Sequence, residues 1–307
     1  MNDQNLTSWI GNTEISVDYL AQAPLVGLAA TLDYTANGTP WRQGWLPPLA
    51  HWLYFLPKAQ QSDIDIDGHP RRGGFLPPID LPRRMWAGGA LQFHAPIPTD
   101  VQLHKRSVLT SIKHKRGSTG DLVFVTVEHR YGVDADALLA GSGGSLLTER
   151  QDIVYREAAA RPALTAGSAG SERSGTTTAS SPARAGDHGS PAPDWLINVP
   201  ADPTRLFRFS ALTFNAHRIH YDRDYATTVE GYPGLVVHGP LCATLLMDLF
   251  LRHHPGTTVR AFTFKALRPL FDTHAFHVCG KGNDNGAKLW ICDADGQVTM
   301  QAMLEAS

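Results

Sequence analysis

The stretch GPLCATLLMDLFLRHHPG, residues 239–256, determines the fold that we predict. Gly239 and Pro240 suit the start of a helix, because proline is tolerated at the first helical position. A Pro-Gly pair at the other end of the stretch stops the helix. Between these points, residues 241–251 are apolar nearly all round, which is typical of a buried helix rather than an amphipathic one. We therefore expect a long central helix that the rest of the fold covers.

Three runs of strand-like sequence follow this helix, at residues 258–270, 274–282 and 288–304. The segments GNDNG (282–286) and DADG (293–296) are typical of hairpin turns. The order of a buried helix and then an antiparallel meander predicts a sheet that wraps around the helix. This arrangement is an α+β fold.

The N-terminal part repeats this outline more faintly. Its predicted elements are a helix-like apolar run at 44–57, a long hairpin formed by 101–117 and 122–132, and a closing strand at 146–157. The segment RRMWAGGALQFHAPIPTD (83–100) also resembles VRAFTFKALRPLFDT (259–273) in the order of its aromatic, basic and proline residues. We infer two copies of one structural unit.

Residues 158–194 separate these two parts. They are almost wholly Ala, Gly, Ser, Thr, Pro and Arg, with Leu164 as the one large apolar residue. Such a stretch buries too little apolar surface to offset the entropy of ordering it. We expect a flexible linker between an N-terminal unit (1–157) and a C-terminal unit (195–307).

Charge and hydropathy exclude several classes of partner. The net charge is −2 and the mean hydropathy is −0.20, so no basic excess indicates binding to nucleic acid or to an anionic membrane surface. The apolar run at 241–251 is too short to span a bilayer and contains Asp248. We therefore expect partners that are small molecules.

The cysteines and the N-terminus indicate the compartment. Cys242, Cys279 and Cys292 form no CxxC pair and no zinc-type spacing with histidine, and an odd, sparse count fits buried thiols in a reducing compartment. The first residues lack the basic and apolar regions of a secretory signal. We expect a cytoplasmic protein.

The densest group of chemically active residues is TFNAHRIHYD, residues 213–222. Residues 205–212 before it are predicted to be a short strand, and a helical stretch is predicted after it. A polar loop, a zinc site and an acid–base site all fit its two histidines. Zinc sites need three protein ligands on a firm support. The nearest carboxylate is Asp222 and no third ligand stands at helical spacing, so we expect no metal.

The longer segment FSALTFNAHRIHYD (209–222) resembles the hydratase motif of the MaoC-like, R-specific enoyl-CoA hydratase family. Ile219-His220 and Asp222 fall on the family's Ile-His and Asp without a gap. Downstream, GLVVHGPLCATLL (234–246) resembles the family's entry into its central helix.

Together with the N-terminal RRMWAGGALQFHAPI, this form of the motif resembles a subgroup with two hot-dog units in one chain. The subgroup includes mesaconyl-C4-CoA, 3-methylfumaryl-CoA and itaconyl-CoA hydratases. The resemblance implies two hot-dog units, each an antiparallel sheet around a long helix. It also implies an acyl-CoA substrate and no cofactor beyond the coenzyme A of that substrate. Two units in one chain make a pseudo-dimer, which could stand alone or pair again as a homodimer.

The motif departs from the family at three positions. Asn215 stands at the position of the catalytic aspartate, His217 at that of the usual asparagine and Arg218 at that of the usual proline. Asparagine cannot take up a proton at neutral pH. The imidazole of His220 remains, with a side chain suited to proton transfer at physiological pH.

These residues lead to a hypothesis for the site. His220 acts as the general base and as the acid, and Asn215 holds the water or orients the imidazole. The backbone N–H of Gly239 stabilises negative charge on the thioester oxygen, because helix N-termini favour anions. His217, Arg218 and His238 are candidates for substrate contacts, with Arg218 suited to a second carboxylate or a phosphate; structural roles remain open for all three.

Two other functions stay open at this point. Hot-dog proteins include thioesterases and binding modules, so the fold alone does not decide the activity. A thioesterase would place a carboxylate near the start of the helix, and Asp248 lies two turns inside it. A non-catalytic acyl-CoA-binding protein is the third possibility, and Asn215 is its best support.

Overall fold

The computed structural model describes residues 6–35, 38–117, 120–140, 143–157 and 192–307. The predicted linker, 158–194, lies outside the described residues except for 192–194, so the boundaries of the two units stay predictions. Within the described ranges, no helix is long and apolar enough to cross a membrane.

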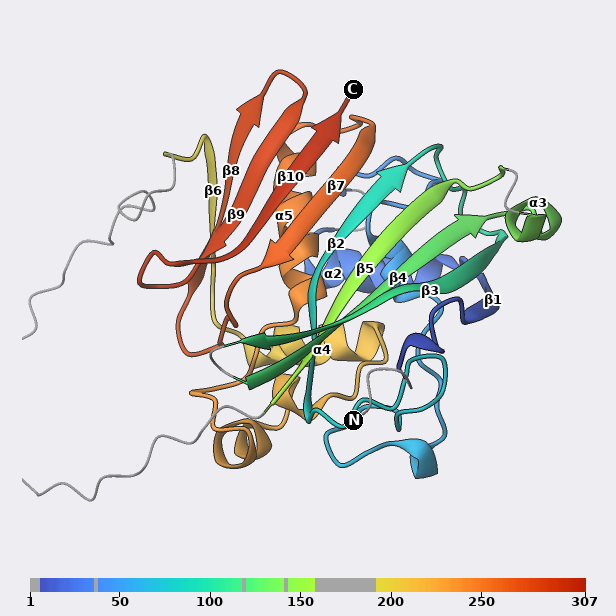
Figure 1. Cartoon of the computed structure of the whole chain (residues 1–307). Coiled ribbons are helices and arrows are strands. Elements are labelled where there is room, and N and C mark those ends of the chain that lie inside the picture. Colours follow the sequence, from blue (N-terminus) through green and yellow to red (C-terminus); the bar gives the residue numbers. More distant parts are fainter. Residues whose placement is uncertain (1–5, 36–37, 118–119, 141–142, 158–191) are drawn as a thin grey trace, which may run out of the picture.

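Ten strands of the described chain form one antiparallel sheet (Figure 1). Its order is β1-β3-β4-β5-β2-β7-β10-β9-β8-β6. The strands are β1 (Thr13–Tyr19), β2 (Arg83–Phe93), β3 (Gln102–Gly117), β4 (Gly120–Gly132), β5 (Leu147–Arg156), β6 (Trp195–Val199), β7 (Val259–Ala266), β8 (Phe276–Asn283), β9 (Gly286–Cys292) and β10 (Val298–Ala306).

The two halves of the sheet have the same order. The N-terminal unit, β1 to β5, runs β1-β3-β4-β5-β2, and the C-terminal unit, β6 to β10, runs β6-β8-β9-β10-β7. Each strand of one half therefore has a counterpart five strands later in the other. Strands β2 and β7, which lie within the two segments that resemble each other in sequence, are counterparts and pair with each other in the middle of the sheet. The predicted fold of two hot-dog units is confirmed.

The central helix of the C-terminal unit is α5 (Gly239–His253). It begins at the predicted glycine, carries Pro240 in its first turn and is buried from Leu241 to Leu251. Strands β6, β8, β9 and β10 lie against it, and Figure 1 shows the sheet passing in front of it. The apolar character of the whole helix surface follows from this enclosure.

The helix predicted at 44–57 is wrong. Only the short 3₁₀-helix η1 (Ala50–Leu53) forms there, because Pro47, Pro48 and Pro57 restrict the backbone on both sides. The longer α-helix of the N-terminal unit is α2 (Gln22–Thr31). Two smaller elements, η2 (Gln61–Asp63) and α3 (Ala135–Ala140), complete this unit.

The strand predicted at 205–212 is also wrong, since this segment is helix α4 (Pro203–Leu212). The Asp202 side chain accepts a hydrogen bond of 2.9 Å from the backbone N–H of Thr204 and caps the helix. Leu206 and Phe209, one turn apart, are buried. The helical stretch predicted after the motif forms a π-helical turn, η4 (Tyr225–Val229), preceded by the 3₁₀ turn η3 (Arg218–His220).

The predicted C-terminal meander holds for β8, β9 and β10 but not for β7. Strand β7 pairs with β10 on one edge and with β2 on the other. A strand has two edges, so β7 has none left for β8. The turns predicted at 282–286 and 293–296 join β8 to β9 and β9 to β10.

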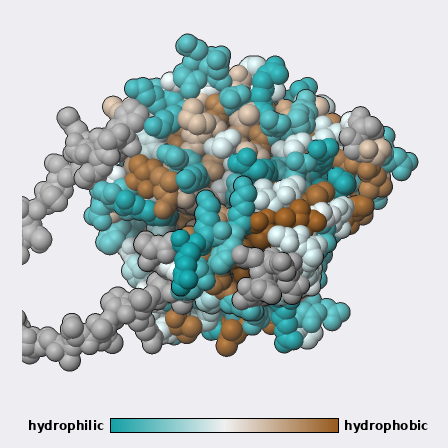
Figure 2. All heavy atoms as spheres, viewed as in Figure 1, coloured by the Kyte–Doolittle hydropathy of each residue, from teal (hydrophilic) through white to brown (hydrophobic). Residues whose placement is uncertain are grey.

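The two units share one core as well as one sheet. A single cluster of buried apolar residues includes Leu20 and Leu91 of the N-terminal unit and Leu246 and Phe262 of the C-terminal unit. At the seam, a Cβ on Gly88 would lie 2.6 Å from the carbonyl oxygen of Phe264, so the two strands meet closely there. Outside this core, Figure 2 shows hydrophobic residues interspersed among hydrophilic ones on the visible face.

Candidate active site

A cavity of about 510 Å³ lies where the two units meet. Strand β2 and the loop before it contribute one wall, and the motif loop with the start of α5 contributes another. Its lining residues include Asp67, His69, Arg83, Arg84, Asn215, His217, His220, Glu230 and Gly239. The site is therefore built from segments far apart in the sequence.

His220 ends η3 and is buried, with 8 % of its surface exposed. Its Nδ1 lies 2.7 Å from the carbonyl oxygen of Val236. A carbonyl can only accept a hydrogen bond, so Nδ1 carries the hydrogen and Nε2 keeps a free lone pair. Burial lowers the pKa of His220 to about 4, and the Val236 contact opposes this in part. The imidazole is thus neutral at physiological pH and able to accept a proton.

His238 stands behind His220, off the cavity wall. Its ring stacks on that of His220 with centroids 3.7 Å apart, and its Nε2 lies 2.8 Å from Ser210 Oγ. Burial holds the pKa of His238 well below its usual value. The structure thus gives it a supporting contact with His220 in place of the substrate contact expected from the sequence.

Gly239 opens α5 and lines the same cavity as His220. Its N–H belongs to the first turn, where amides have no partner within the helix. A Cβ here would find only the Trp86 carbonyl oxygen, at 3.8 Å, so the backbone is open to a ligand. His220 and Gly239, on which the hypothesis from the sequence depends, therefore line the same cavity.

Asn215 also lines the cavity, but half of its amide is already used. Its Oδ1 accepts a hydrogen bond of 3.0 Å from the backbone N–H of His217 and closes a local turn. The side-chain NH₂ group remains available. Among the described contacts, none joins this amide to His220, so the predicted role in orienting that imidazole has no support in the structure.

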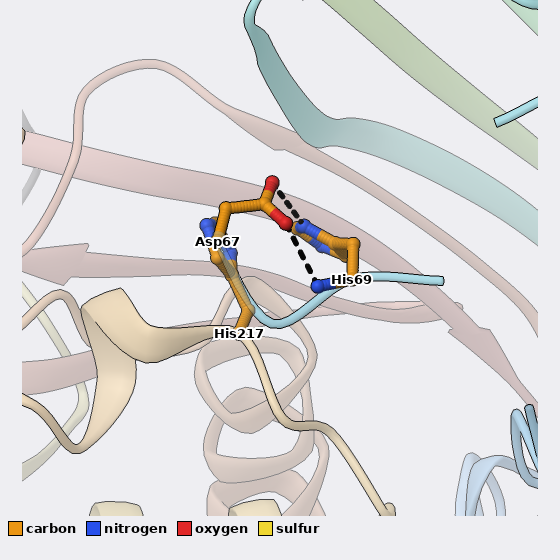
Figure 3. Close-up of side chains that lie close together, drawn as sticks. All are labelled: Asp67, His69 and His217. Carbon is orange, nitrogen blue, oxygen red and sulfur yellow. Dashed lines mark hydrogen bonds and ion pairs between the residues drawn. The ribbon is translucent and has the colours of Figure 1, made fainter. Parts of the chain in front are cut away.

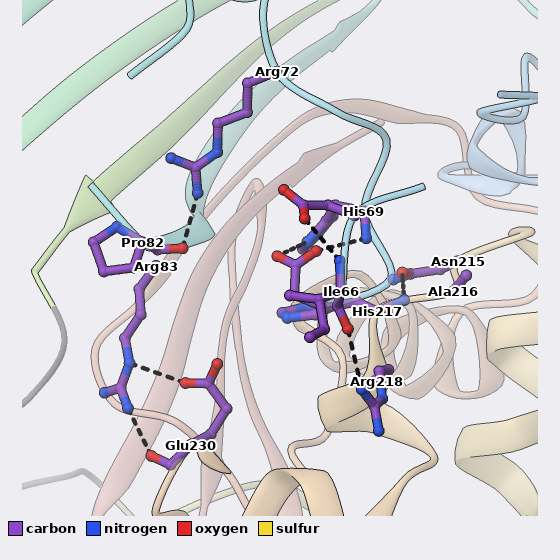
Figure 4. Close-up of polar contacts among 12 residues, drawn as sticks. Ile66, His69, Arg72, Pro82, Arg83, Asn215, Ala216, His217, Arg218 and Glu230 are labelled. Carbon is purple, nitrogen blue, oxygen red and sulfur yellow. Dashed lines mark hydrogen bonds and ion pairs between the residues drawn. The ribbon is translucent and has the colours of Figure 1, made fainter. Parts of the chain in front are cut away.

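Arg218 does not line the cavity. Its guanidinium binds Asp222 Oδ2 through Nε at 3.0 Å and Nη2 at 2.8 Å, and it lies over the ring of Tyr225 at 4.1 Å. The remaining Nη1 donates to the carbonyl oxygen of Ile66 (Figure 4). The predicted substrate contact is therefore replaced by a structural one, because these neighbours already satisfy the planar cation.

Asp67 and His69 are among the cavity residues that the sequence analysis missed. Asp67 Oδ2 lies 2.9 Å from His69 Nδ1, and Oδ1 accepts a hydrogen bond of 2.8 Å from the His69 backbone N–H. The His69 ring lies against that of His217, with centroids 4.0 Å apart (Figure 3). The one local signal was the segment DGHP, where a glycine separates a carboxylate from an imidazole.

The loop that carries this pair is docked on the motif loop. Gly68 has φ of +92°, and a Cβ there would lie 1.8 Å from the carbonyl oxygen of Ala216. The backbone N–H of Arg218 donates to the Asp67 carbonyl oxygen at 2.9 Å. Only glycine fits a left-handed position at such close approach. The two loops therefore have one relative position.

The charges of this group follow from its surroundings. Burial alone would raise the pKa of Asp67, but its hydrogen bonds and charge interaction with His69 hold it well below its usual value. Burial lowers the pKa of His69, and Asp67 opposes that change. Burial, with the neighbouring imidazoles, lowers the pKa of His217 to about 2. At neutral pH we expect a carboxylate beside neutral imidazoles.

Asp67, His69 and His217 lie close enough together that one atom from each could coordinate a metal ion. Two histidines and a carboxylate are ligands that zinc accepts. The hydrogen bond between Asp67 and His69 is the alternative use of the same atoms. The expectation that the protein holds no metal stays a prediction.

Two adjacent arginines of β2 line the cavity and differ in their partners. Arg83 donates to Glu230 Oε2 at 3.1 Å and to the Glu230 carbonyl oxygen at 2.6 Å (Figure 4). Arg84 has no carboxylate partner among the described residues, although its charge acts on His69 and His217. Of these two adjacent guanidiniums, that of Arg83 is neutralised by a carboxylate and that of Arg84 is available.

A second cavity of about 660 Å³ lies on the N-terminal side. It shares His69, Arg84, Trp86 and Asn215 with the first, so these residues stand between the two spaces. Trp86 therefore borders both cavities.

Comparison with known proteins gives consistent matches. The family model described as hydroxyacyl-thioester dehydratase type 2 (Htd2) matches residues 49–272. A mesaconyl-C(4)-CoA hydratase of Chloroflexus aurantiacus is 42 % identical over 306 residues, which cover 99 % of both chains.

Two solved structures support the fold. A MaoC-like dehydratase matches with a TM-score of 0.66 at 14 % identity, covering 98 % of this chain and 99 % of its own. A Mycobacterium tuberculosis protein described as having a double hot-dog fold matches with a TM-score of 0.50 at 14 % identity, covering 97 % and 96 %. At these identities the two structures support the architecture alone.

Proposed function

The chain belongs to the hydroxyacyl-thioester dehydratase type 2 family of hydro-lyases, and we propose that it adds water across the 2,3 double bond of an enoyl-CoA. The reverse reaction, dehydration of a 3-hydroxyacyl-CoA, uses the same site. The observation that carries this proposal is the shared cavity of His220, with a free Nε2 lone pair, and Gly239, with an open first-turn amide.

Hydration needs a base, an oxyanion stabiliser and a proton donor. In our proposal His220 Nε2 removes a proton from water while the water oxygen bonds to the β-carbon. The π electrons move toward the thioester oxygen, where the Gly239 N–H and the N-terminus of α5 stabilise the negative charge. A proton then reaches the α-carbon and the thioester carbonyl is restored. The side-chain NH₂ of Asn215 is placed to contact the substrate or the water.

For the acyl group we propose a short branched dicarboxylic acid, such as that of mesaconyl-C4-CoA. The named activity of the Chloroflexus relative supports this substrate. In mesaconyl-C4-CoA the free carboxylate is attached to the β-carbon, so it must lie next to the reacting bond. Arg84 is a guanidinium on the cavity wall without a carboxylate partner among the described residues, and its planar fork suits a carboxylate.

The activity is tested by incubating the protein with mesaconyl-C4-CoA and, separately, with crotonyl-CoA. Loss of enoyl absorbance and release of free thiol are followed in parallel. We expect absorbance loss without thiol release, and faster turnover of mesaconyl-C4-CoA. Release of thiol would assign a thioesterase instead, and binding without either change would assign a binding protein.

Asp248, the carboxylate considered for a thioesterase, has other contacts. It accepts hydrogen bonds from Tyr34 Oη at 2.7 Å and Arg252 Nε at 2.8 Å, and it does not line the 510 Å³ cavity. This arrangement favours hydration over a hydrolysis that depends on Asp248.

Arg84→Gln tests the proposed substrate class. We expect kcat/KM for mesaconyl-C4-CoA to fall about 10- to 100-fold, since a hydrogen bond to a charged group contributes roughly 1.5–3 kcal/mol. Turnover of crotonyl-CoA, which lacks the second carboxylate, should change little. Arg260→Gln, at an exposed position of β7, is the matched control. Equal losses with both substrates would show that Arg84 does not recognise the carboxylate.

We also propose a cytoplasmic location and a reaction without a resident cofactor. All three cysteines are buried free thiols, which supports a reducing compartment. The proposed chemistry uses only side chains, a backbone amide and the thioester that the substrate brings.

A further inference from the structure

The hydratase motif of this chain lacks the carboxylate of its catalytic aspartate position, but the cavity contains one from another loop. Asn215 occupies the motif position, and Asp67 comes from a loop of the other unit and lines the same cavity. We propose that Asp67 and His69 form the second acid–base pair of the site. In this pair His69 exchanges a proton with the α-carbon of the substrate, and Asp67 is its positioning residue. The proposal rests on the proposed hydratase function.

The hydrogen bonds define the state of the pair. Asp67 accepts from His69 Nδ1, as a buried aspartate does in Asp-His catalytic pairs, so Nε2 of His69 keeps its lone pair. The same carboxylate stabilises the imidazolium that forms when Nε2 takes up a proton. His220 has the same tautomer, with a carbonyl oxygen in place of the carboxylate. Of the two imidazoles, His69 is therefore the one whose protonated form is stabilised by a hydrogen-bonded carboxylate, that of Asp67.

The two imidazoles are linked by a third ring. His217 lies 4.0 Å from His69 and 5.4 Å from His220, measured between ring centroids. Among the described contacts, no hydrogen bond occupies its ring nitrogens. A row of three neutral imidazoles thus runs along the cavity wall, and His217 is placed to carry a proton between its neighbours.

The dehydration step can be written with this row. His69 Nε2 takes the α-proton, and the C–H electron pair moves onto the thioester as an enolate. The enolate collapses and breaks the bond from the β-carbon to its hydroxyl. The proton passes through His217 to His220, which delivers it to the departing hydroxyl. Water leaves and every imidazole returns to its neutral form. Hydration is the reverse, so His69, and not His220, protonates the α-carbon.

The docked loop gives the pair the fixed position that this role requires. Gly68 packs on the carbonyl oxygen of Ala216, and Arg218 holds the loop at Ile66 and Asp67. General acid–base groups need positions defined to about an ångström, because small misplacements cost large factors in rate. This requirement accounts for the contacts by which Arg218 holds the Asp67–His69 loop in place.

His69→Gln and Asp67→Asn test the proposal on the full-length protein with mesaconyl-C4-CoA and crotonyl-CoA. We expect kcat to fall roughly 100- to 10,000-fold in each, as when other general acids and bases are removed. The matched control is Asp63→Asn, an exposed aspartate at the start of the same loop, which should keep wild-type rates. Unfolding temperatures of all variants identify any loss that is due to misfolding.

The pH profile separates proton transfer from a structural role. Burial lowers the pKa of His69, the hydrogen bond and charge of Asp67 oppose this change, and the charges of Arg84 and Arg72 add to it. The neutral form of His69 is needed for dehydration, so activity falls as the pH drops through its pKa. Asp67→Asn should therefore move the acid limb of kcat/KM for dehydration to lower pH. A limb that stays in place while the rate falls would assign Asp67 a structural role only.

An isotope effect assigns the α-carbon step. When the wild-type protein hydrates its enoyl-CoA in D₂O, it adds deuterium to the α-carbon of the product 3-hydroxyacyl-CoA. The deuterium takes the position from which the enzyme removes a proton during dehydration. With this substrate, the deuterium isotope effect on dehydration should rise in His69→Gln and Asp67→Asn but not in His220→Gln. An unchanged effect in the first two variants would overturn the proposal.

Three outcomes distinguish the remaining interpretations. A wild-type protein that hydrates neither substrate contradicts the proposed function. A wild-type protein that hydrates them, with His69→Gln as active as Asp63→Asn, contradicts only the assignment of the pair. Loss of wild-type activity with a chelator and its recovery with Zn²⁺ would assign Asp67, His69 and His217 as metal ligands and overturn the acid–base pair.

Discussion

The two units have the same strand order but carry different kinds of residue to the site. The C-terminal unit has a 15-residue central helix, α5, and at its entrance stand His220 and Gly239. The N-terminal unit has a 10-residue helix, α2, and brings Asp67 and His69 on the loop that precedes β2. One unit thus contributes a helix N-terminus, and the other contributes a carboxylate.

This difference shows how a duplicated scaffold can divide one active site. Strands β2 and β7 join the units, so the loop before β2 lies beside the motif loop of the other copy. In our proposal, the neighbouring loop supplies the carboxylate that is missing at Asn215. Asn215 then closes a turn with His217. The following experiments probe this division.

His220→Gln tests the contribution of the C-terminal unit and should have the largest effect. We expect kcat to fall about 100- to 10,000-fold in both directions, because His220 handles the proton of water. In the wild-type protein the pKa of His220, about 4, leaves its imidazole neutral at physiological pH. We therefore expect the acid limb that His220 contributes to the pH–rate profile near pH 4. His253→Gln, an exposed histidine at the end of α5, is the control. Wild-type rates in His220→Gln would remove it from the mechanism.

Gly68→Ala tests whether the N-terminal unit acts through the position of its loop. The added Cβ would overlap the carbonyl oxygen of Ala216, so the loop must move, and a shift of about 1 Å can cost roughly 100-fold in rate. The control is Gly73→Ala, which has a similar φ of +97° but has its nearest atom, Pro78 Cβ, at 3.8 Å. It should cost only about 1–2 kcal/mol of backbone strain. Similar activity in both variants would contradict a positioned loop.

Glu149→Gln addresses the stability of the N-terminal unit and should have the smallest effect on catalysis. Glu149 is buried and accepts hydrogen bonds from His51, Trp52 and Tyr131 at 2.9–3.0 Å. The variant should lower the free energy of unfolding by about 1–3 kcal/mol.

The pH dependence of this effect has a definite sign. Burial alone would raise the pKa of Glu149, but the hydrogen bonds from His51 and Trp52 and the charge of His51 lower it to about 2. Its contribution to stability is therefore complete above the unfolded pKa, near 4.5, and is lost as the pH falls toward 2. Denaturant titrations from pH 2 to 7 should show a flatter profile in Glu149→Gln, and identical profiles would contradict this role.

The sequence predicted the parts of the fold that local patterns encode. The buried helix and the hairpin turns follow from apolar runs and turn residues, and the pairing of His220 with Gly239 follows from the resemblance of two short segments to a known family. Residues 205–212 were misread as a strand because the apolar residues at 207, 209 and 211 alternate with Arg208 and Ser210, which fits a period of two. The capping Asp202 and Pro203 carried the missed signal.

Contacts between distant segments could not be predicted in this way. Asp67 and His69 form no motif with His217 until the sheet brings the two loops together. Arg218 looked like a free cation in the sequence, but its direction depends on Asp222 and on the docked loop. Residue type suggested the chemistry of these side chains, and only their three-dimensional neighbours decide their roles.

The central claim is that one reaction uses an imidazole from each unit. A double-mutant cycle with His69→Gln, His220→Gln and the combined variant tests it most directly, with kcat for mesaconyl-C4-CoA hydration as the readout. Groups that act as a unit in one proton transfer have strongly non-additive effects. The account predicts that the combined variant is about as slow as the slower single variant. A combined loss equal to the product of the two single losses would contradict it.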